Sequence, residues 1–194
     1  MFMQNSQLSS PNLIYVKKLG LRIVEPYTST FKVSVNKTTK FKKVKFLFKI
    51  RNRLQFLEQD LSKGLFKVNN ENVTGNYILK PNDIIEHTSH YHEPPVFDRE
   101  IKIIHDDEEL LVVDKPCSMP VHPCGRFHYN SLISILKIEK GYPNLRNQNR
   151  IDRDVSGVIA LAKTKNKARY LQNLNETGAT TKLYLALVEG KFPE

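Results

Sequence analysis

A stiff proline break divides this chain of 194 residues into two parts. The stretch Glu93-Pro94-Pro95 contains two consecutive prolines, and a proline fixes its own backbone and restricts the residue before it. A helix or a central strand does not run through such a sequence. We therefore place a domain boundary near residue 97 and expect one domain over residues 1–97 and another over residues 98–194.

The first part is strongly basic. Between Lys37 and Leu57 the chain carries eight cations and no acid, and the formal net charge of the whole chain is +10. The spacing of apolar residues predicts an amphipathic helix over residues 46–64, followed by a hairpin with turns at 69–72 and 80–83. A polyanion would bind these charges by releasing counterions. An anionic membrane surface would use the same charges, and a solvated helix face is the plain alternative.

The second part alternates apolar runs with helical patterns, which together with the first part predicts an α+β fold. Asn130 and Asn166 are the expected helix N-caps, and Gly141 is the expected end of the first helix. The expected elements are a hairpin over residues 101–116, helices over 130–140 and 166–178, and buried strands over 158–164 and 182–190.

Composition excludes several classes of protein. Cys117 and Cys124 are too few for a small disulfide scaffold, so free thiols in a reducing compartment are expected. The sequence has no apolar run of membrane-spanning length, and its first dozen residues do not form a secretory signal. We expect a cytoplasmic protein without membrane partners, with the nucleus and the mitochondrion as alternatives.

Asp152 lies in the charged stretch NRIDRDVSG (residues 149–157), directly before an apolar run that predicts a strand. Arg150 and Arg153 flank it, and neighbouring cations favour the ionised form of a carboxylate. A loop held by a rigid strand is a usual place for catalytic groups. An ionised Asp there can act as a nucleophile or a general base, and a turn residue or helix cap is the ordinary alternative.

Three histidines close to one acid raise the question of a metal site. His87, His90 and His92 precede Glu93, and alternate residues of a strand can reach one ion. No cysteine or distant fourth ligand accompanies them. We therefore expect no metal here and interpret these residues as part of the connection between the two domains.

Four segments, in this order along the chain, resemble the RluA-type pseudouridine synthases, and most closely their eukaryotic tRNA-modifying branch. The stretch NRIDRDVSGVIALAKT is similar to the signature of that family, in which an aspartate is followed by an apolar strand. The other three segments are a stretch ending HEPPV (92–96), VVDKPCSMPVHPCGRFHYNSL (112–132) and KLYLALVEG (182–190). Two departures are Asn149, where the family has His, and the lack of its later Leu-x-Thr-Gly-Arg-x-His-Gln-Ile-Arg motif.

The resemblance implies a function and a set of roles. It implies isomerisation of uridine to pseudouridine in structured RNA, with tRNA as the expected substrate, rRNA as an alternative, and no metal or organic cofactor. Asp152 would be catalytic, Tyr184 would stack on the flipped base, and Arg150 would hold the nucleotide out of its helix. The other expected RNA-binding residues are Arg153, Lys42, Lys43, Lys45, Arg51 and Arg53.

The resemblance also implies an architecture. Residues of about 46–92 would form an αL-type RNA-binding module. Residues 98–194 would then form the N-terminal half of a mainly antiparallel catalytic domain. Because the later arginine motif has no counterpart, a catalytically inactive RNA-binding fragment or a degenerate homologue is the alternative function.

Overall fold

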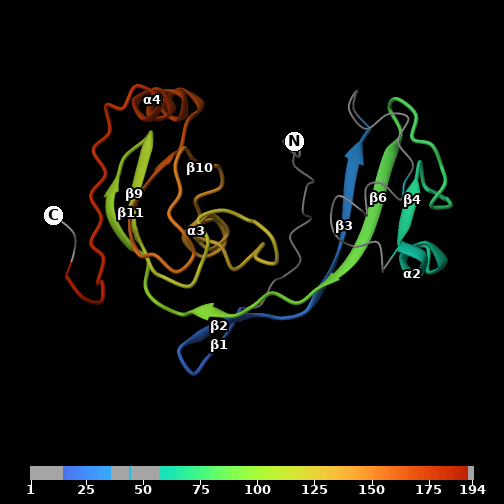
Figure 1. The fold of residues 1–194 in the computed structure, drawn as a ribbon, viewed down its shortest axis with the longest axis horizontal. Helices are drawn as coiled ribbons and strands as arrows, with labels where there is room; N and C mark the ends of the chain where they lie inside the picture. Colours follow the sequence, from blue (N-terminus) through green and yellow to red (C-terminus); the bar gives the residue numbers. More distant parts are fainter. Residues whose placement is uncertain (1–14, 36–43, 45–56, 192–194) are drawn as a thin grey trace. The chain divides into compact units, whose positions relative to one another are not determined.

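The computed structural model describes residues 15–35, 44 and 57–191 of the chain. It divides into two compact units (Figure 1). Unit 1 comprises Met1–Tyr15 and Val24–His92, and unit 2 comprises Val16–Ile23 and Glu93–Glu194. The predicted α+β class with mainly antiparallel sheets is confirmed. Most of the expected basic helix lies outside the described residues, which contain only its end, α2 (Leu57–Ser62).

Unit 1 is built on a four-stranded sheet in the order β3-β6-β4-β5, with every strand pair antiparallel. The strands are β3 (Tyr27–Ser34), β4 (Phe66–Val68), β5 (Glu71–Asn72) and β6 (Ile84–Tyr91). Asn69 and Asn70 both have positive φ, which asparagine tolerates better than most residues, so the predicted turn forms between β4 and β5. The core comprises Val35, Val44, Phe66, Val68, Leu79 and Ile85.

Unit 2 contains a second four-stranded sheet, in the order β10-β11-β9-β8. Its strands are β8 (Lys102–Asp106), β9 (Leu110–Lys115), β10 (Arg146–Asn147) and β11 (Gly157–Ala162), all antiparallel. The predicted hairpin is therefore confirmed as β8 and β9, and the strand expected over 158–164 as β11. Strands β9 and β11 and helix α3 (Leu132–Lys140) contribute many of the buried apolar side chains of this unit, among them Leu111, Val113, Leu132, Ile135, Leu136, Ile159 and Leu161.

The two predicted helices of unit 2 are present, but both predicted N-caps are wrong. Helix α3 (Leu132–Lys140) starts after Ser131, because the side-chain amide of Asn130 is buried and donates to the carbonyl of Pro94 at 2.9 Å. Helix α4 (Lys165–Glu176) starts after Thr164, whose hydroxyl accepts from the backbone N–H of Lys167. Gly141 ends α3 with φ +77°, as predicted.

A small three-stranded sheet brings Val16–Ile23, which precede the sheet of unit 1 in the chain, into unit 2. It contains β1 (Tyr15–Lys18), β2 (Leu21–Val24) and β7 (Val96–Phe97) in the order β1-β2-β7. Strands β2 and β7 are antiparallel, with Leu21 opposite Phe97. Sequence periodicity gave no indication that this pairing would form.

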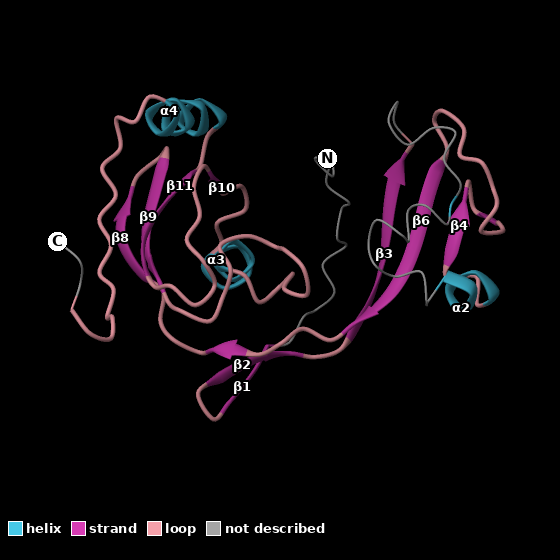
Figure 2. Ribbon diagram, in the orientation of Figure 1, coloured by secondary structure: helices cyan, strands magenta, loops and turns pink. Residues whose placement is uncertain are grey.

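The strand expected over residues 182–190 is wrong. This segment has no β pairing in the described chain, and Leu183, Leu185 and Leu187 are exposed. Figure 2 draws it as loop between α4 and the C-terminus. Alternating apolar residues show that a segment fits a pleated sheet, but a strand forms only where a partner edge offers its backbone groups. The sheet of unit 2 provides no such partner within the described residues.

Candidate functional site

Asp152 is exposed on the loop that joins β10 to β11. Its carbonyl accepts from the backbone N–H of Val155 at 3.2 Å, which closes a tight turn. Strand β11 then begins at Gly157, whose φ of +134° is a conformation that side-chain-bearing residues rarely adopt. The loop therefore presents the Asp152 carboxylate at the end of a strand that buries Ile159 and Leu161 in the core.

Lys115 ties this loop to the end of β9. The side chain is completely buried, and its ammonium donates to the carbonyls of Pro116 at 2.9 Å, Met119 at 2.8 Å and Arg153 at 3.3 Å. Burial lowers the pKa of Lys115, while negative charge at Cys117, Asp154 and Asp152 acts in the opposite direction. These three hydrogen bonds hold the backbone after β9 and the backbone of the Asp152 loop together.

The two arginines beside Asp152 have different surroundings. Arg153 makes two hydrogen bonds of 3.0 Å to the carboxylate of Asp154, and its guanidinium lies over the ring of Phe127, 5.7 Å from the centroid. Arg150 is exposed. Its charge contributes to the electrostatics of His122, whose pKa is lowered first by burial and then by Arg150. The loop thus carries two exposed carboxylates, Asp152 and Asp154, of which Asp154 is paired with Arg153.

The other predicted site residues are not brought to this loop by any contact in the described chain. Tyr184 lies on the unpaired segment 182–190 and is 69% exposed, so its stacking role stays a prediction. The predicted RNA-binding residues of the basic run lie outside the described residues, and their role also stays a prediction: Lys42, Lys43, Lys45, Arg51 and Arg53.

The histidines near the proline break have ordinary structural contacts. The His87 ring lies 2.9 Å from the carboxylate of Asp60, and His90 lies 3.3 Å from the hydroxyl of Thr28. Glu93 instead accepts from the backbone N–H groups of three consecutive residues, His128, Tyr129 and Asn130. Within the described ranges no three His, Cys, Asp or Glu side chains are grouped so as to hold a metal ion.

Comparison with known proteins finds one matching family. Residues 109–194, which include the whole Asp152 loop and the segment 182–190, match the family model described as RNA pseudouridylate synthase. Over this segment the chain has the sequence pattern of the RNA pseudouridylate synthase family. The match begins one residue before β9. It therefore covers both Lys115, at the end of β9, and the loop that carries Asp152.

Relatives that match most of this chain include proteins of a plant and of a yeast. The chain is 36% identical to RNA pseudouridine synthase 7 of Arabidopsis thaliana, over 100% of this chain and 50% of that protein. It is 34% identical to the mitochondrial tRNA pseudouridine(32) synthase of Saccharomyces cerevisiae, over 90% of this chain and 38% of the relative. The tRNA pseudouridine(31) synthase of the same yeast is 32% identical, over 90% and 48%. The chain spans half or less of the length of these relatives.

A solved structure, the human RNA pseudouridylate synthase domain containing 4, is also similar to part of this chain. The two are 31% identical where they align, which covers 39% of this chain and 29% of the human chain, with a TM-score of 0.31.

Two contributors to the site were missed by sequence reasoning. Lys115 follows Leu111 and Val113 at two-residue steps, so a period of two already placed all three on the same face of one strand. That pattern was a usable signal for a buried lysine. The anchoring of residues 128–130 by Glu93 had no comparable signal, because the two segments are 35–37 residues apart in the chain.

Proposed function

We propose that this chain isomerises uridine to pseudouridine in structured RNA, with tRNA as the substrate class and Asp152 as the catalytic residue. The C1′–N1 glycosidic bond breaks, the base turns, and a C1′–C5 bond forms. N1 gains a proton and C5 loses one, so the reaction balances without an oxidant, a reductant or a cofactor. A stacked base has no room to rotate, so the target uridine leaves its helix first.

The single observation that carries this proposal is the Asp152 loop itself. It lies within the family match, its carboxylate is exposed, and its backbone is held by the buried Lys115. Rigid support of this kind is what a catalytic group requires, because small errors of position cost large factors in rate. Arg150 and Arg153 supply positive charge beside the place where RNA phosphates would lie.

Tyr184 is the proposed stacking partner of the flipped base. Its ring is open to solvent and an aromatic ring is a general platform for a base. The names of two yeast relatives specify tRNA, which supports tRNA over other structured RNA for this chain. No helix among the described residues is long and apolar enough to cross a membrane. We propose a cytoplasmic or mitochondrial location, and imaging of the tagged full chain would distinguish the two.

The test is pseudouridine mapping on tRNA treated with the wild-type chain and with Asp152→Ala. The substitution should reduce isomerisation by more than about a thousandfold, because it removes the group that reacts with the uridine. RNA binding should change little. The control is Glu108→Gln, an exposed acid on the β8–β9 turn, which should keep full activity. Activity that survives in Asp152→Ala would refute the catalytic role.

An RNA-binding protein without turnover is the second candidate. The observation that favours it is the unpaired segment 182–190, which leaves Tyr184 without a defined position near Asp152. The same experiment separates the two candidates. Equal RNA binding by the wild type and Asp152→Ala, with isomerisation by neither, would establish this second function.

The basic run provides a test of the RNA footprint that does not depend on catalysis. Each phosphate contact adds close to one unit to the slope of log affinity against log salt concentration. Replacing Lys42, Lys43 and Lys45 by Gln should weaken RNA binding and reduce that slope by about 2–3. Filter binding over a salt series measures it. An unchanged slope would remove the basic run from the RNA-binding surface.

A further inference from the structure

A hollow of about 370 Å³ lies beside the Asp152 loop, entirely within unit 2. One wall is apolar. It comprises Leu21 of β2, Phe97 of β7 and Pro95, which directly precedes β7. The other wall is polar and includes Ser118, Arg153 and Asp154. Arg153 and Asp154 directly follow Asp152 in the chain, so this hollow adjoins the catalytic loop.

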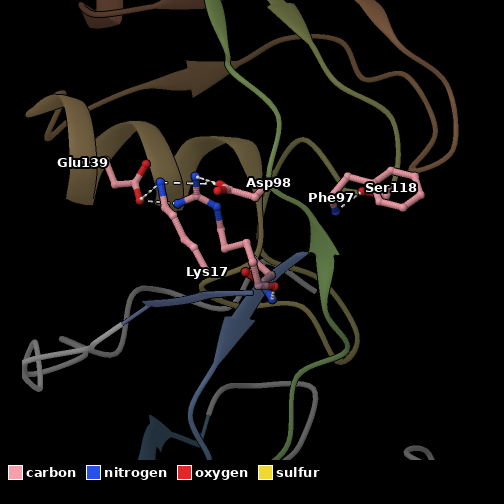
Figure 3. A network of polar contacts seen from close by, with 7 residues as sticks. Lys17, Phe97, Asp98, Ser118 and Glu139 are labelled. Carbon is pink, nitrogen blue, oxygen red and sulfur yellow. Dashed lines mark hydrogen bonds and ion pairs between the residues drawn. The ribbon is translucent and has the colours of Figure 1, made fainter. Parts of the chain in front are cut away.

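Phe97 is an exposed aromatic side chain on a fixed backbone. Its N–H donates to the hydroxyl of Ser118 at 2.8 Å, a contact drawn in Figure 3, and its strand pairs with Leu21. The ring remains 42% exposed although it belongs to the wall of the hollow. The guanidinium of Arg99 lies over the ring, 5.4 Å from its centroid. An exposed aromatic ring held in place beside cations is typical of a platform for an unstacked base.

The strands that carry Phe97 are fixed to unit 2 by a charged network. Arg22, on β2, is buried and pairs with Asp98 at 2.8 Å and with Glu139 of α3. Lys17 of β1 reaches the same two carboxylates, at 3.4 and 3.5 Å (Figure 3). The platform is therefore tied both to a helix and to the loop that contains Ser118.

Flipping a uridine leaves the nucleotide beside it without a stacking neighbour. We propose that the hollow holds this adjacent nucleotide, with its base stacked on Phe97 and its phosphate close to Arg153. The proposal rests on the proposed function, which supplies the flipped uridine. It makes Phe97 a binding residue for the RNA strand, separate from the group that reacts.

The test uses a hairpin RNA whose loop carries one uridine flanked by 2-aminopurine, a fluorescent base that is quenched when it stacks. Binding of the wild-type chain should quench the signal. Phe97→Leu keeps an apolar side chain and removes the aromatic face, so it should abolish the quenching and weaken binding about tenfold, which corresponds to about 1.4 kcal/mol. Phe97→Tyr should retain both.

Tyr170→Leu is the matched control. Tyr170 is an exposed aromatic residue on α4, with the Lys167 ammonium 5.5 Å from its ring centroid, so it reproduces the aromatic–cation pair on another element of unit 2. It should leave quenching and affinity unchanged. Equal losses in Tyr170→Leu and Phe97→Leu would overturn the proposal, and so would full quenching by Phe97→Leu. Circular dichroism on each variant shows that the fold is kept.

Cys117 offers a second measurement, because it also lines the hollow and the chain has only one other cysteine. In a Cys124→Ser background, the hairpin RNA should slow alkylation of Cys117 by N-ethylmaleimide at least severalfold, and Phe97→Leu should remove that protection. Unchanged alkylation in the presence of saturating RNA would place the RNA elsewhere.

The outcomes also separate this proposal from the proposed function. Quenching that depends on Phe97, without isomerisation by the wild type, would support the nucleotide site and refute the enzyme. Isomerisation without quenching that depends on Phe97 would support the enzyme and refute the nucleotide site.

Discussion

A buried charge closes turns in each unit, Asp83 in unit 1 and Lys115 in unit 2, and these two charges have opposite sign. In unit 1, Asp83 is buried and accepts from the backbone N–H of Lys80 at 2.8 Å, the amide of Asn69 at 2.9 Å and the hydroxyl of Tyr77 at 3.2 Å. In unit 2, Lys115 donates to three carbonyls. An ionised carboxylate only accepts hydrogen bonds and an ammonium only donates them. Asp83 therefore binds N–H and O–H groups, whereas Lys115 binds carbonyl oxygens.

The two charges differ in how far apart in the chain their partners lie. The longest reach of Asp83 is to Asn69, 14 residues away, and its other two partners are within six residues. Lys115 reaches Arg153, 38 residues away, beside the proposed catalytic residue. The anion of unit 1 therefore stabilises local turns, whereas the cation of unit 2 joins the distant Asp152 loop to the sheet.

Removing Lys115 should produce the largest effect. Lys115→Met keeps much of the apolar stem and leaves the buried carbonyls of Pro116 and Met119 and the partly buried carbonyl of Arg153 without their donor, so the free energy of unfolding should fall by about 3–5 kcal/mol. Isomerisation should fall further than RNA binding, because the loop that carries Asp152 loses its support. Urea unfolding measures the first effect, and pseudouridine mapping beside RNA binding measures the second. Hydrogen exchange at the Val155 amide reports the loss of support for the loop. Lys165→Met, an exposed lysine at the start of α4, is the control and should change neither.

Removing the charge of Asp83 should produce a smaller effect that is confined to unit 1. Asp83→Asn should lower the free energy of unfolding by about 1–2 kcal/mol, because charged acceptors make stronger hydrogen bonds than an amide. The exchange rate of the Val155 amide in unit 2 should stay unchanged. Glu58→Gln, an exposed acid on α2, is the control. A loss of order in the Asp152 loop would contradict the local role of Asp83.

The pH dependence of Asp83 sharpens the same contrast. Burial raises the pKa of Asp83, but the hydrogen bonds from Lys80, Asn69 and Tyr77 and the charge of Lys80 outweigh it, so the pKa lies below its usual value of 3.8. A carboxylate with a lowered folded-state pKa stabilises the fold above pH 3.8 and loses that contribution as the pH falls through the folded-state value. Acid unfolding of Asp83→Asn should therefore be less steep than that of the wild type. Acid-unfolding curves of equal steepness for the wild type and Asp83→Asn would contradict a stabilising role of the Asp83 carboxylate.

His122 provides the smallest expected effect, in unit 2. Burial and the charge of Arg150 lower its pKa below 6.5, so the folded state holds the ring neutral where the unfolded chain would protonate. The unfolded state then binds more protons, and stability should fall as the pH decreases from 6.5 through the folded-state pKa. His122→Asn should remove this slope, an effect of less than about 1 kcal/mol. Calorimetry between pH 7 and 5 measures it, and a variant with the wild-type slope would refute the assignment.

Local elements of both units could be predicted from the sequence, because local physics decides them. Positive φ at Asn69 and Asn70 and the left-handed end at Gly141 follow from the conformations that these residues tolerate. The predictions of the two N-cap residues were wrong because several polar residues near each helix start can cap it. Tertiary contacts determine which of these residues does so. Asn130 is a residue type that often caps helices, but in the fold its side-chain amide donates to the carbonyl of Pro94 instead.

Long-range features of the site could not be predicted in the same way. The position of Asp152 on a loop before a strand was readable, whereas the link from Lys115 to Arg153 depends on the register of β9 against β11, which places Gly157 opposite Lys115. In residues 182–190 a local pattern is present and the long-range partner is lacking within the described residues. Their alternation fits a strand, yet no partner edge accepts them in the described chain.

The pairing of β2 with β7 has a consequence for protein synthesis. Arg22 leaves the ribosome early, but its ion-pair partners Asp98 and Glu139 follow 76 and 117 residues later. At the usual elongation rate, the delay before Glu139 is made is on the order of ten seconds. Unit 1 can complete its own sheet within that time, while β2 waits for the strand and helix that bury its arginine. Strand β2 is thus made before the sheet of unit 1, but it is packed in unit 2 only after α3 has been made.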